Sequence, residues 1–180
     1  MDPRRRFFLR GALTPGASRA APPALPRPPW ALADEAAFTA RCTRCGECSR
    51  VCPRALIRPG DGGFPEIRFT ERGCDECGAC RAACPSGALQ PPPPAPAVDT
   101  MPAFRWRIQV APTCLAQHRV ECRVCAESCD TGALRCRPAL GGISQLVLDP
   151  AACTGCGECL APCPVGALSL AVPEAGSEAA

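Results

Sequence analysis

Cysteine spacing constrains this chain more than any other feature. Three segments repeat the pattern Cys-x2-Cys-x2-Cys-x3-Cys-Pro without deviation. Their cysteines are Cys42, Cys45, Cys48 and Cys52; Cys74, Cys77, Cys80 and Cys84; and Cys153, Cys156, Cys159 and Cys163. Two-residue gaps let a looping backbone bring three thiolates around one cubane cluster, and this is the ligand spacing of [4Fe-4S] sites. The sequence therefore predicts several iron–sulfur clusters.

The fourth cysteine of each run is expected to leave its own cluster, because in two-cluster bacterial ferredoxins it ligates the neighbouring one. The proline after it has no N–H to donate and a fixed φ, which suits a sharp exit from the site. Two clusters would then cross-link the two cysteine runs of the first half of the chain. Their expected ligands are Cys42, Cys45, Cys48 and Cys84 for one, and Cys74, Cys77, Cys80 and Cys52 for the other.

One further run, the third in chain order, departs from the pattern. It reads Cys114-x7-Cys122-x2-Cys125-x3-Cys129, and Asp130 takes the place of the proline. Five extra residues precede Cys122, so the assignment of Cys114 stays open and the expected load is three to four [4Fe-4S] clusters. The expected ligands in this half are Cys114, Cys122, Cys125 and Cys163 for one cluster, and Cys129, Cys153, Cys156 and Cys159 for the other.

Other uses of the cysteines fit less well. Zinc sites normally use CxxC pairs that are well separated in sequence, whereas these runs are close triplets. An odd count of 17 cysteines and the lack of an evident cleavable signal argue against a disulfide framework. Cys136 falls outside every run, and a half-buried small apolar side chain is favoured there over a ligand. His118, the only histidine, is favoured as an exposed loop residue over a ligand that replaces Cys114.

The composition indicates a fold that forms around metal. With six Phe, two Trp and no Tyr, the apolar core must be thin, and the net charge of +3 is too small to indicate disorder. The 20 basic residues are scattered among 17 acids and form no basic stripe, so a nucleic-acid-binding surface is not expected. No apolar run approaches the roughly 20 residues of a membrane span, so the chain is not expected to be integral to a bilayer. No Ser/His/Asp set, phosphate loop or dinucleotide fingerprint is present, so an enzyme is not expected.

Proline-rich segments and an internal repeat divide the chain into two similar halves. The segments 58–69 and 137–148 match in spacing, and each contains a Gly-Gly pair that predicts a tight hairpin turn. Cys136 lies in the strand before the second turn. Further strands are expected at 105–110 and 167–172, with short helices following or overlapping the cysteine runs.

We therefore expect an α+β fold of tandem, bacterial ferredoxin-like, two-cluster units with metal-nucleated cores and Pro-rich flanks. A stiff, extended QPPPPAP segment joins the units. The expected parts are a flexible Pro-rich leader (1–32), a first unit (33–89), a linker (90–103), a second unit (104–172) and a tail (173–180).

The N-terminus imitates a twin-arginine export signal, because Arg5 and Arg6 precede Phe7, Phe8 and Leu9. A true signal continues into an apolar segment, but here prolines and further arginines interrupt the following stretch. A flexible basic tail and a cytoplasmic location are therefore expected.

Several segments carry a resemblance to a known family. They are Arg4 to Gly11 (RRRFFLRG), Arg27-Pro28-Pro29-Trp30, Cys42-Thr43-Arg44-Cys45, and Cys114-Leu115-Ala116 running into Val120-Glu121-Cys122-Arg123. On these residues the chain resembles the NapF family, the ferredoxin-type accessory proteins of periplasmic nitrate reductase systems. The x7 gap after Cys114, which departs from ordinary ferredoxins, looks like that family's own pattern.

The resemblance implies a cytoplasmic protein that acts on the catalytic molybdenum subunit of periplasmic nitrate reductase before that subunit is exported. The implied role is maturation of this partner. Two alternatives remain open from the sequence: an electron-carrier subunit that serves an oxidoreductase, and a static scaffold whose clusters only stabilise the fold. Exposed arginines beside the runs, such as Arg44 and Arg123, are favoured as ordinary solvated charge over groups that steer an acidic partner.

Overall fold

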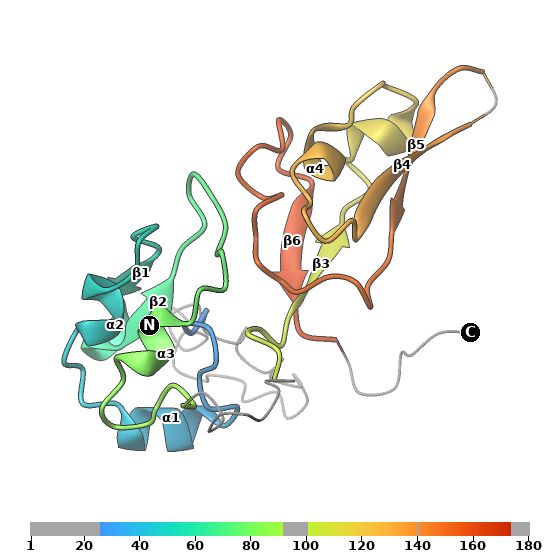
Figure 1. The fold of residues 1–180 in the computed structure, drawn as a ribbon. Helices are drawn as coiled ribbons and strands as arrows, with labels where there is room; N and C mark the ends of the chain where they lie inside the picture. Colours follow the sequence, from blue (N-terminus) through green and yellow to red (C-terminus); the bar gives the residue numbers. More distant parts are fainter. Residues whose placement is uncertain (1–25, 92–100, 140, 174–180) are drawn as a thin grey trace, which may run out of the picture.

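The computed structural model describes residues 26–91, 101–139 and 141–173. Its fold is a mixture of short helices and small strands (Figure 1). The helices are α1 (Glu35–Arg41), α2 (Glu47–Arg50), α3 (Ala79–Ala82) and α4 (Val124–Glu127), with 3-10 turns η2 (Asp61–Gly63) and η3 (Leu115–His118). The strands are β1 (Ile57–Pro59), β2 (Pro65–Ile67), β3 (Arg107–Val110), β4 (Leu134–Pro138), β5 (Ser144–Leu148) and β6 (Leu168–Ala171). The arginine-rich N-terminal segment, residues 92–100 of the linker and residues 174–180 of the tail lie outside the described residues.

Both predicted hairpins are confirmed. Strand β1 pairs antiparallel with β2, and β4 pairs antiparallel with β5. Both residues of each Gly-Gly pair have a positive φ, the left-handed conformation that side chains disfavour. Cys136 lies in β4, as expected, opposite Leu146.

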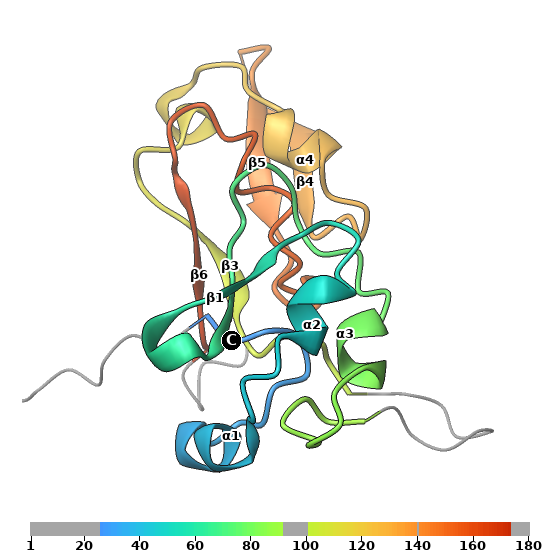
Figure 2. The same cartoon turned by 90° about the vertical axis from the view of Figure 1, so that its left-hand side faces the viewer.

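The strands expected at 105–110 and 167–172 are also confirmed, as β3 and β6. They pair with each other in antiparallel register, from Arg107 opposite Ala171 to Val110 opposite Leu168. Figure 1 and Figure 2 both show the two strands side by side. This pairing closes the second half of the chain, because it joins the segment before the third cysteine run to the segment after the fourth.

Helices overlap the first three cysteine runs as expected, but the described structure of the fourth run contains none. In the first three runs, the residue before the last cysteine donates its N–H four residues back: Val51 to Glu47, Ala83 to Ala79 and Ser128 to Val124. In the fourth run the equivalent residue is Pro162. Proline has no N–H, so this helical hydrogen bond cannot form and the segment remains a series of turns.

Helix α1, which the sequence analysis did not anticipate, precedes the first run. Asp34 caps it by accepting a 2.8 Å hydrogen bond from the N–H of Ala37. Acid in the first turn and Arg41 in the last turn both suit the helix dipole. The helix buries Phe38 completely, with 0% of that residue exposed.

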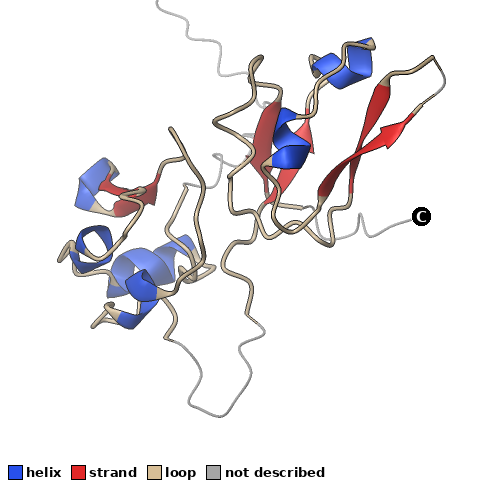
Figure 3. Cartoon of the chain, turned by 45° about the horizontal axis from the view of Figure 1, so that its top comes forward, coloured by secondary structure: helices blue, strands red, loops and turns tan. Residues whose placement is uncertain are grey.

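The apolar core is small and divided. One cluster of buried residues gathers in the first half around Phe38, Ile57 and Leu89, and others lie in the second half around Ile108, Leu134 and Ala167. In Figure 3 the helices concentrate in the first half and the longer strands in the second. Cysteines belong to every one of these clusters, so cysteine side chains supply much of what the core buries.

The described end of the N-terminal segment contacts the rest of the fold. Residues 27–30 are buried, and the N–H of Trp30 donates to the carbonyl of Ala103 at 2.8 Å. Gln90 in turn donates to the carbonyl of Trp30. Because Trp30 offers a large apolar surface to a core short of aromatic residues, residues 27–30 pack there.

None of the helices among the described residues is both long enough and apolar enough to cross a bilayer.

Candidate metal centres

Four hollows in the described structure are lined by cysteines, and we number them from the N-terminal end. The first has a volume of about 300 Å³ and is lined by Cys42, Cys45, Cys48 and Cys84. Helix α2 places Cys48 at its inner wall, while Cys84 reaches it from the end of the second run. The structure therefore brings together the four thiols that the sequence assigned to one cluster.

The second hollow also contains a thiol from the other run. It is lined by Cys74, Cys77 and Cys80, and by Cys52 from the end of the first run. Its volume is about 20 Å³, much less than that of the first hollow. The two runs of the first half thus exchange their fourth cysteines in space.

The second half repeats this arrangement. The third hollow is lined by Cys114, Cys122, Cys125 and Cys163. The fourth is lined by Cys129, Cys153, Cys156 and Cys159. Cys114 lies with the set to which the spacing assigned it, because the 3-10 turn η3 takes up the extra residues between it and Cys122. Among the described residues no three His, Cys, Asp or Glu side chains converge as the ligands of a single metal ion, at the hollows or elsewhere.

Two further candidates lie outside the hollows. His118 is exposed at the end of η3 and does not line the third hollow. Cys136 is half-buried, and its Sγ lies 3.9 Å from the carbonyl oxygen of Cys122. Neither side chain joins a set of four thiols.

The backbone around the second cysteine of each regular run has an alternating conformation. The residues immediately before and after it both have a positive φ: Arg44 and Gly46, Glu76 and Gly78, and Gly155 and Gly157. Left-handed residues in such turns aim successive N–H groups into one concavity and create a site for an anion. A cubane held by four thiolates carries net negative charge, so these loops fit it. In the irregular third run, Arg123 has a φ of −122° and the feature is missing.

The fourth cysteine of three runs accepts a backbone hydrogen bond on sulfur. Leu89 donates to Cys84 at 3.4 Å, Leu134 to Cys129 at 3.5 Å, and Ala167 to Cys163 at 3.3 Å. Burial raises the pKa of Cys84, but hydrogen bonds from Leu89 and Ser86 outweigh burial, and the pKa is lowered. The same balance lowers the pKa of Cys129, through Leu134 and Thr131. The hydrogen bonds to the Cys84 and Cys129 sulfurs therefore favour their thiolate forms.

The third cysteine of each run is buried, and in the irregular run Cys114 is buried as well. Burial is the main cause that raises the pKa of the Cys48 and Cys125 thiols to about 11, and of Cys80 and Cys159 to about 12. Such thiols are protonated at neutral pH without a compensating positive charge, which iron supplies. Cluster binding must therefore release protons and stabilise the folded chain together.

Comparison with known proteins agrees with this geometry. The family described as 4Fe-4S dicluster domain matches residues 41–88 and 118–167. Ferredoxin-type protein NapF of Haemophilus influenzae is 42% identical over 80% of this chain and 77% of its own length. Ferredoxin-type protein NapF of Escherichia coli K12 is 39% identical over 79% of this chain and 82% of its own length. Ferredoxin-type protein NapG of Haemophilus influenzae is 39% identical over 54 residues.

These matches and the cysteines of the chain establish multiple [4Fe-4S] clusters as its cofactor. The fold is accordingly that of a ferredoxin-like dicluster domain with short helices and small strands.

Proposed function

Because the chain belongs to the family of ferredoxin-type NapF proteins, we propose that it is an iron–sulfur accessory protein of the periplasmic nitrate reductase system. It binds the catalytic subunit of that enzyme in the cytoplasm, before export, and assists its maturation. Support comes from identity of about two-fifths over about four-fifths of the chain to relatives with that name. The similarity of a shorter stretch to NapG also points to this system.

The observation that carries the iron–sulfur part of the proposal is that each hollow is lined by four thiols from two different runs. The clusters supply one-electron redox chemistry when bound. The chain supplies the ligands, the left-handed loops that receive negative charge, and the N–H groups directed at sulfur. The 16 hollow-lining cysteines would form two units of two clusters, over residues 33–89 and 104–172.

The protein would act through its clusters and its partner, not as an enzyme with a substrate of its own. Four thiols line each of the four described hollows, together with other side chains such as Arg44 and Glu47 at the first, and the proposal assigns each hollow to a cluster. An accessory protein must recognise the immature partner, whereas a carrier must recognise the working enzyme. The partner's state therefore separates the two roles.

The test is anaerobic co-purification from cells that make the catalytic subunit, with antibodies that distinguish its signal-bearing and mature forms. We expect tagged protein to recover the signal-bearing form. A strain that lacks the protein should make catalytic subunit with poor activity, which the wild-type gene restores. Recovery of only the mature, exported form would instead support the electron-carrier role.

A matched pair of variants separates cluster function from folding. Cys122→Ser removes a proposed ligand of the third hollow, whereas Cys136→Ser changes a nearby thiol that lines none of the four hollows. We expect Cys122→Ser protein to be made but to yield poorly active catalytic subunit, and Cys136→Ser to behave as wild type. A reporter that is active only after export should stay silent when fused to the protein.

A further inference from the structure

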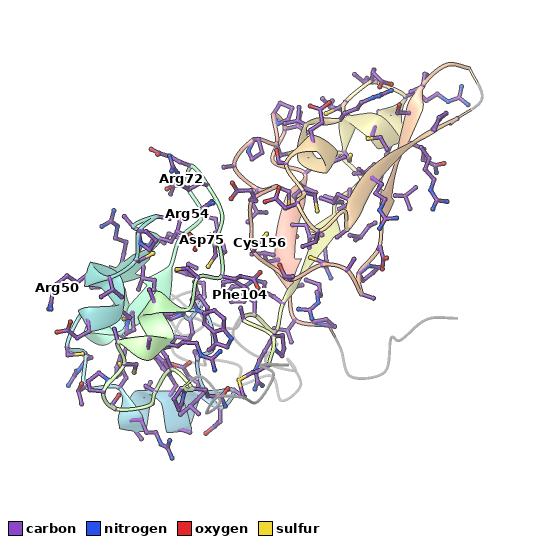
Figure 4. The ribbon with its side chains drawn as sticks, viewed as in Figure 1. Arg50, Arg54, Arg72, Asp75, Phe104 and Cys156 are labelled. Carbon is purple, nitrogen blue, oxygen red and sulfur yellow. The ribbon has the colours of Figure 1, made fainter. Side chains whose placement is uncertain are left out.

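The second and fourth hollows meet across the two halves of the chain. The N–H of Cys74, which lines the second hollow, donates to the carbonyl of Cys156, which lines the fourth, at 2.8 Å. Figure 4 shows Arg54 and Asp75 on the side of the first half that faces Cys156. The loops around two cluster sites are therefore in direct backbone contact, although they lie in different halves of the chain.

An ion pair crosses the same boundary. Nη1 of Arg54 lies 3.2 Å and 3.1 Å from the two carboxylate oxygens of Glu158. The same nitrogen donates to the carbonyl of Gly73 at 3.1 Å, and Nε lies 3.6 Å from Asp75. Arg54 follows the Cys52-Pro53 exit of the first run, and Glu158 lines the fourth hollow. Arg54 thus links Asp75, which lines the second hollow, to Glu158, which lines the fourth.

Gly73 allows the two loops to approach this closely. Its N–H donates to the carboxylate of Glu158. A Cβ atom at this position would lie 2.3 Å from the backbone nitrogen of Glu158 and 2.6 Å from the carbonyl oxygen of Cys156. Both neighbours are backbone atoms and cannot turn away, so any side chain here must separate the halves.

Aromatic side chains pack at the boundary between the two halves, beside the contact of Gly73 with Glu158. Phe69 packs edge-on against Phe104 and Trp106, at centroid distances of 6.1 Å and 6.4 Å. Nε1 of Trp106 donates to the carbonyl of Gly155 at 2.8 Å. A Cβ on Gly157 would lie 2.7 Å from the Phe69 ring. Two glycines of the fourth run are therefore fitted against aromatic side chains of other segments.

We propose that Arg54, Gly73 and Glu158 are positioning residues that hold the second and fourth cluster sites against each other, so that the clusters of the two halves interact magnetically. This inference rests on the ligand sets proposed above but not on the nitrate reductase partner. The sites then follow one another in space as first, second, fourth and third. The charges, the close glycine contact and the backbone hydrogen bond all act at the same part of the boundary between the halves.

The test uses electron paramagnetic resonance of the complete protein, reduced to completion as checked by spin count. Gly73→Ala should separate the loops and remove the part of the spectral broadening that comes from spin coupling between the halves. Iron should remain at about 16 per chain, four for each site. The matched control is Gly60→Ala: like Gly73, that glycine lies outside the left-handed region, and the three atoms nearest to its added Cβ all belong to the end of the Glu66 side chain, which can turn away. Its spectrum should equal that of wild type.

Glu158→Ala is a second variant that adds no atom and removes both the ion pair and the acceptor for Gly73. It should narrow the spectrum in the same direction as Gly73→Ala, whereas Glu47→Ala, which breaks only the ion pair with Arg50, should not. The proposal is overturned if both Gly73→Ala and Glu158→Ala keep the wild-type spectrum at full iron. It is also overturned if both lose iron, since the contact would then serve cluster binding. Iron analysis thus separates a failure of the ligand sets from a failure of the positioning role.

Discussion

Cys84, the last cysteine of the second run, lines the same hollow as Cys42, the first cysteine of the first run. Cys52 makes the reciprocal exchange into the hollow of the second run. If the thiols of one hollow ligate one cluster, replacing two cysteines of the same set should lose no more iron than replacing one of them. Replacing one cysteine from each of two sets should lose the sum of the two single losses. Cys84→Ala with Cys45→Ala should lose about four iron atoms, as either variant alone does, because both thiols serve one cluster.

The matched pair is Cys84→Ala with Cys77→Ala, whose thiols line different hollows. This double variant should lose about eight iron atoms, measured with labile sulfide on anaerobically purified protein. The crossed assignment would be wrong if Cys84→Ala were additive with Cys45→Ala but not with Cys77→Ala.

Iron content also tests the irregular run. Wild-type protein should carry about 16 iron and 16 sulfide, and Cys114→Ala should lower both to about 12, because Cys114 lines the third hollow. Cys136→Ala should leave the load unchanged, since its thiol lies at the carbonyl of Cys122 outside the set. A wild-type load of about 12 would remove Cys114 from the ligands, and zinc without sulfide would refute cluster binding.

Removal of metal should unfold the chain. The buried apolar clusters are small and include cysteines in each case, so the clusters and not side-chain burial must supply much of the folding free energy. After chelation of iron and loss of sulfide, far-ultraviolet circular dichroism should fall to that of a largely unfolded chain. A cooperative thermal transition in the apo-protein would contradict this expectation.

Arg27 offers a stability test away from the clusters. Its side chain is 9% exposed, donates to both carboxylate oxygens of Glu35 and lies over the rings of Phe38 and Phe64. Glu35→Ala should lower the free energy of unfolding by about 2 kcal/mol, because among the described contacts it leaves the buried guanidinium with the carbonyl of Pro65, at 3.2 Å, as its remaining acceptor. The value is below that of a fully buried pair because the Glu35 side chain is 49% exposed.

The control for this measurement is Glu47→Ala. Its partner Arg50 is 66% exposed, so the loss should be within about 0.5 kcal/mol. Anaerobic urea unfolding, followed by the visible absorbance of the clusters, measures both variants. Equal effects of the two substitutions would mean that burial of Arg27 does not matter.

The sequence by itself determined the parts of this protein that depend on local spacing. Cysteine intervals predicted the sets of thiols, the Gly-Gly pairs predicted both hairpins, and the flanks of the second half predicted β3 and β6. Such features could be predicted because a ligand loop or a tight turn is decided by a few adjacent residues. Helix α1 could also have been found, since Asp34 followed by Glu35 is an N-terminal capping signal.

Only the tertiary structure decided which distant segments meet. Spacing cannot reveal that the N–H of Trp30 donates to the carbonyl of Ala103. It cannot reveal that Gly73 and Glu158 join the two halves either. Each of these contacts depends on backbone atoms that packing brings together from distant parts of the chain. The residues of one segment do not indicate which other segment they will contact.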